Sequence, residues 1–266
     1  MGLIHRLRTL VSRFVNTTYP WPALDVTLAG GRYLHLVGSI HMGTPDMAPL
    51  PPRLLQKLAR ADALIVEADI SDSSSPFPTD NNMPPLRERL SEENWARTES
   101  RLHELALDAC SIDGLPYWQA ALILQAHQAQ RLGLRPDFGI DFQLLQSAHL
   151  AGKPVIELEG AQSQVELLKT LPDGGLTLLE DTLAHWHTNA RLLQTMVSWW
   201  LESPPGVQPG MLPSTFSSEL YDVLMTRRNA QWRAFLHKLP PGRYVVAVGA
   251  LHLFGEENLP QLLKKN

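Results

Sequence analysis

Two segments far apart in the chain place a histidine after an apolar run in the same local frame. The first reads LHLVGSIHMG and the second VVAVGALHLFG. Gly38 stands three positions before His41, and Gly249 stands three positions before His252. Glycine lets the backbone turn sharply and pass close to a bound molecule. We therefore predict that both segments are strand exits and that the two histidines frame one site from opposite sides.

Two carboxylates follow other apolar runs, Glu67 in ALIVEAD and Glu159 in IELEG. Ligands of open α/β sheets bind at the carboxyl ends of the strands, so parallel strands would bring these acids to the histidines. Imidazole and carboxylate bind divalent transition metals, with water in an open position. The same groups serve as a general base and its orienting partner without a metal. Separate structural roles for each group are the third alternative.

Other polar residues give weaker indications. Ser39 lies beside His41, but the Gly-x-Ser-x-Gly pattern of a nucleophile elbow is absent. Asp141 is most simply a helix N-cap. Arg228 in RRNAQW is suited to clamp a carboxylate, with an ordinary surface charge as the alternative. His185, two residues before another histidine, shares no helix face with it and is not expected to bind a metal.

The elements that must position these residues form an α/β pattern. A hairpin is expected around Gly30 and Gly31, with further strands at about 63–69, 154–158 and 244–249. The continuous apolarity of 63–69 indicates a strand that is covered on both faces. Helices are predicted over 91–132, 162–171, 176–202 and 216–238. We expect a segment 1–20 and one domain, 21–266, in which a mixed, largely parallel sheet is flanked by helices and carries a helical insert at about 91–135 and 162–238.

Composition narrows the classes of function. The chain has 266 residues and a net charge of −4, which disfavours nucleic-acid binding. Cys110 is the only cysteine, so an internal disulfide and a cysteine-based zinc site are excluded. No apolar run is long enough to span a membrane, and we expect a cytoplasmic protein without a signal peptide. The first residues, MGLIHRLRTLVSRFV, predict a helix packed on the domain, with a peripheral membrane helix as the alternative.

The chain resembles the TraB/GumN family, to which the TIKI proteins are related, and is most similar to its small single-domain bacterial members of YbaP type. The matching segments are YLHLVGSIHMG, ADALIVEADI, GID at 139–141, AGKPVIELEG, RRNAQW and YVVAVGALHLFGEENLPQLL, from about residue 24 to the end. The resemblance implies a mixed sheet of two related halves, shared with erythromycin-esterase-like and ChaN-like proteins. It also implies that Gly38, His41, Gly249 and His252 are the family's paired motifs and Glu67 its strand glutamate.

The TIKI branch implies a metal-dependent peptidase that favours manganese or cobalt, whereas plasmid TraB proteins shut down a peptide pheromone. We therefore expect a metal-dependent hydrolase of a peptide or small molecule, with manganese, cobalt or zinc as cofactor. The expected metal ligands are His41, Glu67, His252 and Glu159, of which the first three are also the expected catalytic residues. The substrate-binding or supporting residues are Gly38, Ser39, Asp141, Arg228, Asn229 and Gly249. The alternatives are a metal-free esterase, with His41 as base oriented by Glu67, and a non-catalytic binding protein.

Overall fold

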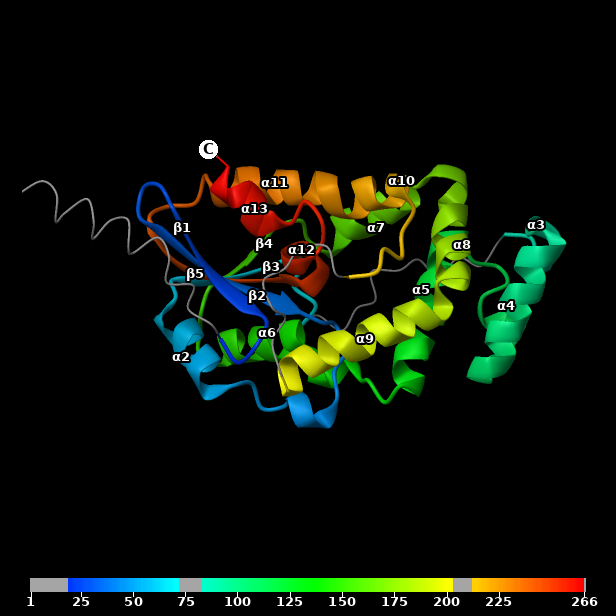
Figure 1. Ribbon diagram of the computed structural model, residues 1–266, viewed down its shortest axis with the longest axis horizontal. Coiled ribbons are helices and arrows are strands. Elements are labelled where there is room, and N and C mark those ends of the chain that lie inside the picture. The colour runs from blue at the N-terminus through cyan, green and yellow to red at the C-terminus, as the bar shows by residue number, and fades with distance from the viewer. Residues whose placement is uncertain (1–18, 72–82, 203–211, 266) are drawn as a thin grey trace, which may run out of the picture.

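The computed structural model describes residues 19–71, 83–202 and 212–265 (Figure 1). The predicted N-terminal helix lies outside these residues, as do most of the polar loop 71–85 and most of the Pro/Gly-rich break at 204–213. Within the described part of the chain, helices lie on both faces of a central sheet and extend beyond one end of it (Figure 1).

The sheet has five strands in the order β1-β2-β5-β3-β4. Their bounds are Ala23–Leu28 for β1, Arg32–Ser39 for β2, Ala63–Val66 for β3, Val155–Glu157 for β4 and Gly242–Gly249 for β5. β1 pairs antiparallel with β2 through the predicted Gly30-Gly31 turn, and the other pairs are parallel. The predicted mixed, largely parallel sheet is confirmed. The carboxyl ends of β2, β3, β4 and β5 therefore share one edge.

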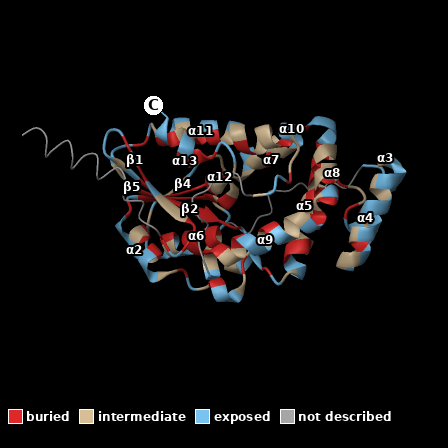
Figure 2. Ribbon diagram, in the orientation of Figure 1, coloured by how far each residue is buried: buried red, intermediate tan, exposed pale blue. Residues whose placement is uncertain are grey.

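Two helical layers cover the sheet. One face packs against α2 (Pro52–Arg60), α6 (Ile140–Leu150) and α9 (Trp186–Leu201), and the other against α11 (Arg227–Leu236), α12 (Ala250–Phe254) and α13 (Leu259–Lys264). In β5, Val245 and Ala247 face the first layer while Val246 and Val248 face the second. Burial of both faces explains the continuous apolar runs (Figure 2).

A third apolar cluster lies within the helical insert and contains no residue of the sheet. Its elements are α3 (Leu86–Arg89), α4 (Glu92–Leu105), α5 (Tyr117–Arg131), α7 (Ala161–Lys169), α8 (Leu176–Ala184) and α10 (Ser218–Tyr221), together with the start of α9. Trp118 and Trp186 are among its fully buried side chains. The insert therefore has a core of its own.

Three predicted helices of this insert are in fact interrupted. The helix predicted over 91–132 ends at Ala106, which has a left-handed φ of 55°, and restarts after Pro116. The one predicted over 176–202 breaks at His185. The one predicted over 216–238 contains a π-helical turn, Asp222–Thr226, between α10 and α11. Among the described residues, no helix is long and apolar enough to cross a membrane.

Candidate active site

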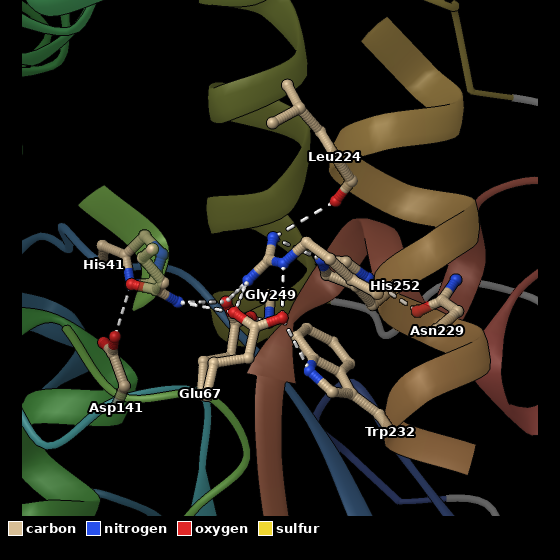
Figure 3. Close-up of polar contacts among 11 residues, drawn as sticks. His41, Glu67, Asp141, Leu224, Asn229, Trp232, Gly249 and His252 are labelled. Atoms are coloured by element: carbon tan, nitrogen blue, oxygen red, sulfur yellow. Dashed lines mark hydrogen bonds and ion pairs between the residues drawn. The ribbon is translucent and has the colours of Figure 1, made fainter. Parts of the chain in front are cut away.

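Glu67 follows directly after β3 and reaches the end of the neighbouring strand. Its Oε1 accepts a hydrogen bond from the backbone N–H of Gly249, the last residue of β5, at 2.7 Å (Figure 3). A Cβ atom on Gly249 would lie 3.4 Å from this Oε1 atom. Close approach of Gly249 to the site is therefore observed.

Neither glycine of the repeated motif needs a left-handed backbone, however. Gly249 has φ −48°, and Gly38 lies inside β2 instead of at its exit. A Cβ atom on Gly38 would lie 3.1 Å from the Phe254 ring and 3.3 Å from Ala250. The glycine thus lets α12 pack closely on β2, and the predicted sharp turn at Gly38 is wrong.

Arg228, from the first turn of α11, joins the two glutamates. Its Nη2 donates to Glu67 Oε2 at 2.6 Å and to Glu159 Oε2 at 2.9 Å, and its Nε donates to Glu159 Oε1 at 2.8 Å. The Arg228 side chain is only 13% exposed, and each of the two carboxylates is 10% exposed. Charges buried this far from water need such partners. The surface-charge interpretation of Arg228 is wrong, and the carboxylates that it clamps are those of the site.

The pKa of Glu67 reports the balance of charges around this carboxylate. Burial by itself raises the pKa, but the charges of Arg228, His252 and His41 and the hydrogen bond from Gly249 outweigh burial and lower it to about 2. Glu67 is therefore ionised at neutral pH.

His252 lies on α12, is buried, and packs against the Trp232 ring at 4.4 Å between ring centroids. Asn229 Nδ2 donates to the Glu257 carbonyl, which leaves Asn229 Oδ1 to face His252 Nδ1 at 2.7 Å (Figure 3). Because that oxygen can only accept, the proton is on Nδ1. His252 Nε2 then faces Arg228 Nη1 at 3.3 Å. Burial lowers the pKa of His252 to about 3, with Arg228 and His41 acting in the same direction, so the ring is neutral.

His41 follows β2 and has the opposite environment. Its Nδ1 is hydrogen-bonded to Asp141 on α6, and 66% of its side chain is exposed (Figure 3). The Asp141 charge raises the pKa of His41 to about 9, and the hydrogen bond to Asp141 and the Glu67 charge act in the same direction. Asp141 has no N-capping role, since the N-cap of α6 is Gly139. The N-cap interpretation of Asp141 is therefore wrong. The prediction that Glu67 orients His41 is also wrong, because Asp141 holds the ring.

Backbone contacts fix this pair. Ile140 N–H donates to the Ile40 carbonyl at 3.0 Å, which joins the chain just before His41 to the start of α6. A Cβ atom on Gly139 would lie 2.4 Å from the His41 carbonyl oxygen, and one on Gly43 would lie 2.2 Å from the Phe138 oxygen. Only glycine allows these two segments to approach so closely.

Two residues of the site were not predicted from the sequence. Trp232 Nε1 donates to Glu159 Oε1 at 2.8 Å, and Gln164 Nε2 lies 3.2 Å from Glu67 Oε2 and 3.4 Å from Glu159 Oε2. Trp232 is four residues after Arg228 on one helix, and Gln164 is in the first turn after Gly160. Helical spacing of four residues was the available signal for Trp232.

The remaining predicted residues have supporting positions. Ser39 is buried at the end of β2, where it pairs in register with Gly249. Asn229 is fully buried and fixes the His252 ring. Of the four side chains that were predicted to converge, Glu67, Glu159 and His252 all contact Arg228. His41 makes no hydrogen bond with them and affects them only through its charge.

The site does not have the geometry of a metal shared by these residues. Among the described residues, no group of three or more His, Cys, Asp or Glu side chains could hold a metal ion. The Arg228 guanidinium already contacts Glu67, Glu159 and His252, so three of the four expected ligands face a cation, while His41 pairs with Asp141.

Comparison with known proteins agrees with the sequence motifs. The chain is 57% identical over 264 residues to an uncharacterized protein YbaP from Escherichia coli (strain K12), covering 99% of this chain and all of the relative. The YbaP protein of Shigella flexneri matches with the same identity and coverage. No solved structure gives a significant match. The model of the TraB/PrgY/gumN family matches residues 24–266. The predicted resemblance is thus confirmed, and the chain belongs to the TraB/PrgY/gumN family.

Proposed function

We propose that the protein hydrolyses an ester or amide bond in a peptide or small molecule, with His41 as the general base. The observation that carries this proposal is the pairing of an exposed imidazole with a buried carboxylate. Asp141 is 9% exposed at its side chain and holds His41 Nδ1, so the other ring nitrogen, Nε2, is directed away from that bond. A base oriented by a fixed acceptor is the arrangement of many hydrolases that act through an activated nucleophile.

The proposed reaction uses water as nucleophile. Neutral His41 Nε2 takes a proton from water while the water oxygen adds to the carbonyl carbon, which leaves negative charge on the carbonyl oxygen. Collapse of this adduct breaks the bond to the alcohol or amine, which receives the proton back from His41. Asp141 stabilises the imidazolium that forms between the two steps. Arg228 holds Glu67 and Glu159 in place through its ion pairs and helps to keep Glu67 ionised.

Metal-dependent hydrolysis is the second candidate, and one observation favours it. Glu67 and Glu159 share the Arg228 guanidinium, and Asp141 pairs with His41, so with His41 neutral these three carboxylates are balanced by one cation. This excess of negative charge would attract a cation. Manganese, cobalt or zinc would supply Lewis-acid chemistry there when bound, provided that Arg228 moved.

The test is turnover of ester and peptide substrates, such as nitrophenyl esters and quenched fluorescent peptides. We expect activity in the presence of a chelator, and a loss of about 10²- to 10⁴-fold in His41→Ala. His185→Ala, at the break between α8 and α9, should retain full activity. Activity that appears only with added manganese, cobalt or zinc would replace this proposal by the metal-dependent one. Saturable binding of a peptide without turnover would establish a binding protein instead.

We also propose a cytoplasmic location for this hydrolase. The absence of a membrane-spanning helix among the described residues supports this only in part. Fractionation of cells that express the untagged chain tests it, since recovery of the protein with membranes or in the periplasm would contradict it.

A further inference from the structure

We propose that a second site, independent of the proposed hydrolase, binds the phosphate or carboxylate group of a small anion. It is a cavity of about 260 Å³ between the end of α2 and the first residues of β2 and β5. Tyr33 and His35 line it from β2, and Arg243 and Val245 line it from β5. These positions lie at the amino ends of the parallel strands, whereas the candidate active site lies at their carboxyl ends.

Positive charge dominates the cavity. Its lining contains three cationic side chains, Lys57 and Arg60 from α2 and Arg243 from β5, and one carboxylate, Asp25 from β1. The whole chain carries a net charge of −4, so this concentration of positive charge departs from the average of the molecule. Cations gathered in a concave site raise the local concentration of anions.

Two of the three cations are available to a ligand. Arg60 makes no hydrogen bond or ion pair with any other described residue, and Arg243 only stacks its guanidinium on the Tyr33 ring at 5.1 Å. Stacking leaves the edge of the guanidinium, with its N–H donors, free for oxygen atoms. Lys57 is partly engaged, at 3.4 Å from both oxygens of Asp25. Arginine pairs are well suited to phosphate and carboxylate because the planar fork matches two oxygens.

The floor of the cavity is held rigid. Tyr19 donates to Asp25 Oδ2, and His35 Nδ1 lies 2.7 Å from Asp25 Oδ1. Asp25 in turn holds Lys57. Such fixed groups lose little freedom when a ligand binds. The C-terminal carbonyls of α2 would repel an anion, but Lys153 Nζ binds the Ala59 and Ala61 carbonyls at 2.9 and 2.7 Å.

The test uses the full chain with sodium phosphate and sodium citrate as probes, against sodium chloride at equal ionic strength. A ligand that binds the folded state raises the melting temperature saturably. We expect a saturable rise with at least one probe and, by NMR, a shift of the His35 ring signals next to the cavity. The probe that acts distinguishes phosphate from carboxylate recognition.

The double variant Arg60→Gln/Arg243→Gln should weaken binding by about tenfold or more, because it removes the charge-assisted hydrogen bonds of both arginines to the anion. Arg87→Gln is the matched control, because Arg87 is an exposed residue of α3 outside the cavity lining, and it should bind like the wild type. If the double variant unfolds, the single variant Arg60→Gln is used to test binding, because substitution of the exposed Arg60 leaves the fold intact. Binding that is unchanged in these variants, or no saturable response to either probe, overturns the proposal.

Discussion

His41 and His252 occupy the same position in a repeated motif and yet differ in exposure and in pKa. The side chain of His41 is 66% exposed, and Asp141 raises its pKa. His252 is 4% exposed, and burial lowers its pKa. Environments that push two pKa values apart assign different tasks to the two groups. We therefore assign proton transfer to His41 and a fixed, neutral supporting role to His252.

The first prediction concerns the pH dependence of hydrolysis. A general base must be unprotonated, so kcat/KM should rise with pH and level off above the pKa of His41, between the ordinary 6.5 and about 9. Solvent around the exposed His41 imidazole weakens the effect of Asp141 on its pKa. Asp141→Asn removes the charge that raises the pKa, so the rising limb should move to lower pH. A rate that instead falls over this range would make His41 an acid.

The second prediction compares two adjacent arginines. Arg228→Ala leaves two buried carboxylates without their cation and should lower the free energy of unfolding by about 3–5 kcal/mol. Arg227 pairs with Asp222 at the surface, where the two side chains are 66% and 45% exposed. Arg227→Ala should therefore cost at most about 1 kcal/mol. Urea denaturation of both variants measures this difference, and equal losses would contradict the buried network.

At the scale of elements, the site depends on how the segment after β2 meets the start of α6. Gly43 and Arg135 exchange two backbone hydrogen bonds, of 3.0 and 2.7 Å, and Gly139 passes under the His41 carbonyl. These contacts join parts of the chain about a hundred residues apart, as the His41–Asp141 pair does. The loop and the helix therefore position the base and its partner together.

The variant Gly139→Ala tests this close packing of the segment after β2 against the start of α6. Its φ of −58° suits any residue, so the cost comes from the Cβ atom, which would lie 2.4 Å from the His41 oxygen. We expect a loss of activity, and we expect the rise of kcat/KM with pH to move to lower pH, as in Asp141→Asn. Gly133→Ala is the opposite control, because its φ is 86° but nothing lies within 4 Å of an added Cβ. Gly133→Ala should lower the free energy of unfolding by about 1 kcal/mol and leave the pH dependence of kcat/KM unchanged.

The sequence predicted the elements better than the contacts between them. The apolar run at 63–69 and the Gly30-Gly31 turn predicted strands because burial and turn geometry are local properties. The break at Ala106 was missed because a left-handed alanine has no strong local signal. Glu67 and Glu159 were recognised at strand ends, but the sequence could not show that Arg228 lies between them. The sequence around Asp141 indicates a helix N-cap, because the partner of this carboxylate, His41, lies about a hundred residues away in the chain.

At the scale of the whole molecule, buried ionisable groups make stability depend on pH. Between about pH 6.5 and 3, folded His252 binds fewer protons than the unfolded chain, so stability is lost as pH falls through this window. Glu67 and His35, whose pKa values are also lowered, act in the same direction. His41 acts in the opposite direction, because its raised pKa means that its contribution is lost as pH rises from 6.5 towards 9.

We therefore predict a maximum of stability near pH 6.5, measured as the free energy of unfolding in urea across pH 4–9. The alkaline decline should be the shallower one, since His41 is exposed. His41→Ala should flatten the alkaline side, and His252→Gln should make the acid decline shallower, with the remainder due to Glu67 and His35. An alkaline or acid decline that is unchanged by the matching substitution would contradict the role given to that histidine.

The π-helical turn at Asp222–Thr226 has a consequence for how this site can change by insertion and deletion. A π-helical turn holds one residue more than the α-helical turn that it replaces, and each α-helical residue rotates the chain by about 100°. Deleting one residue from this turn would restore continuous α-helical hydrogen bonding between α10 and α11. Because the π turn and the α turn that would replace it both complete one revolution, Arg228, Asn229 and Trp232 would keep their direction relative to α10. This segment can therefore lose one residue while the three side chains still point at the site, whereas a deletion in the α-helical part would turn them away.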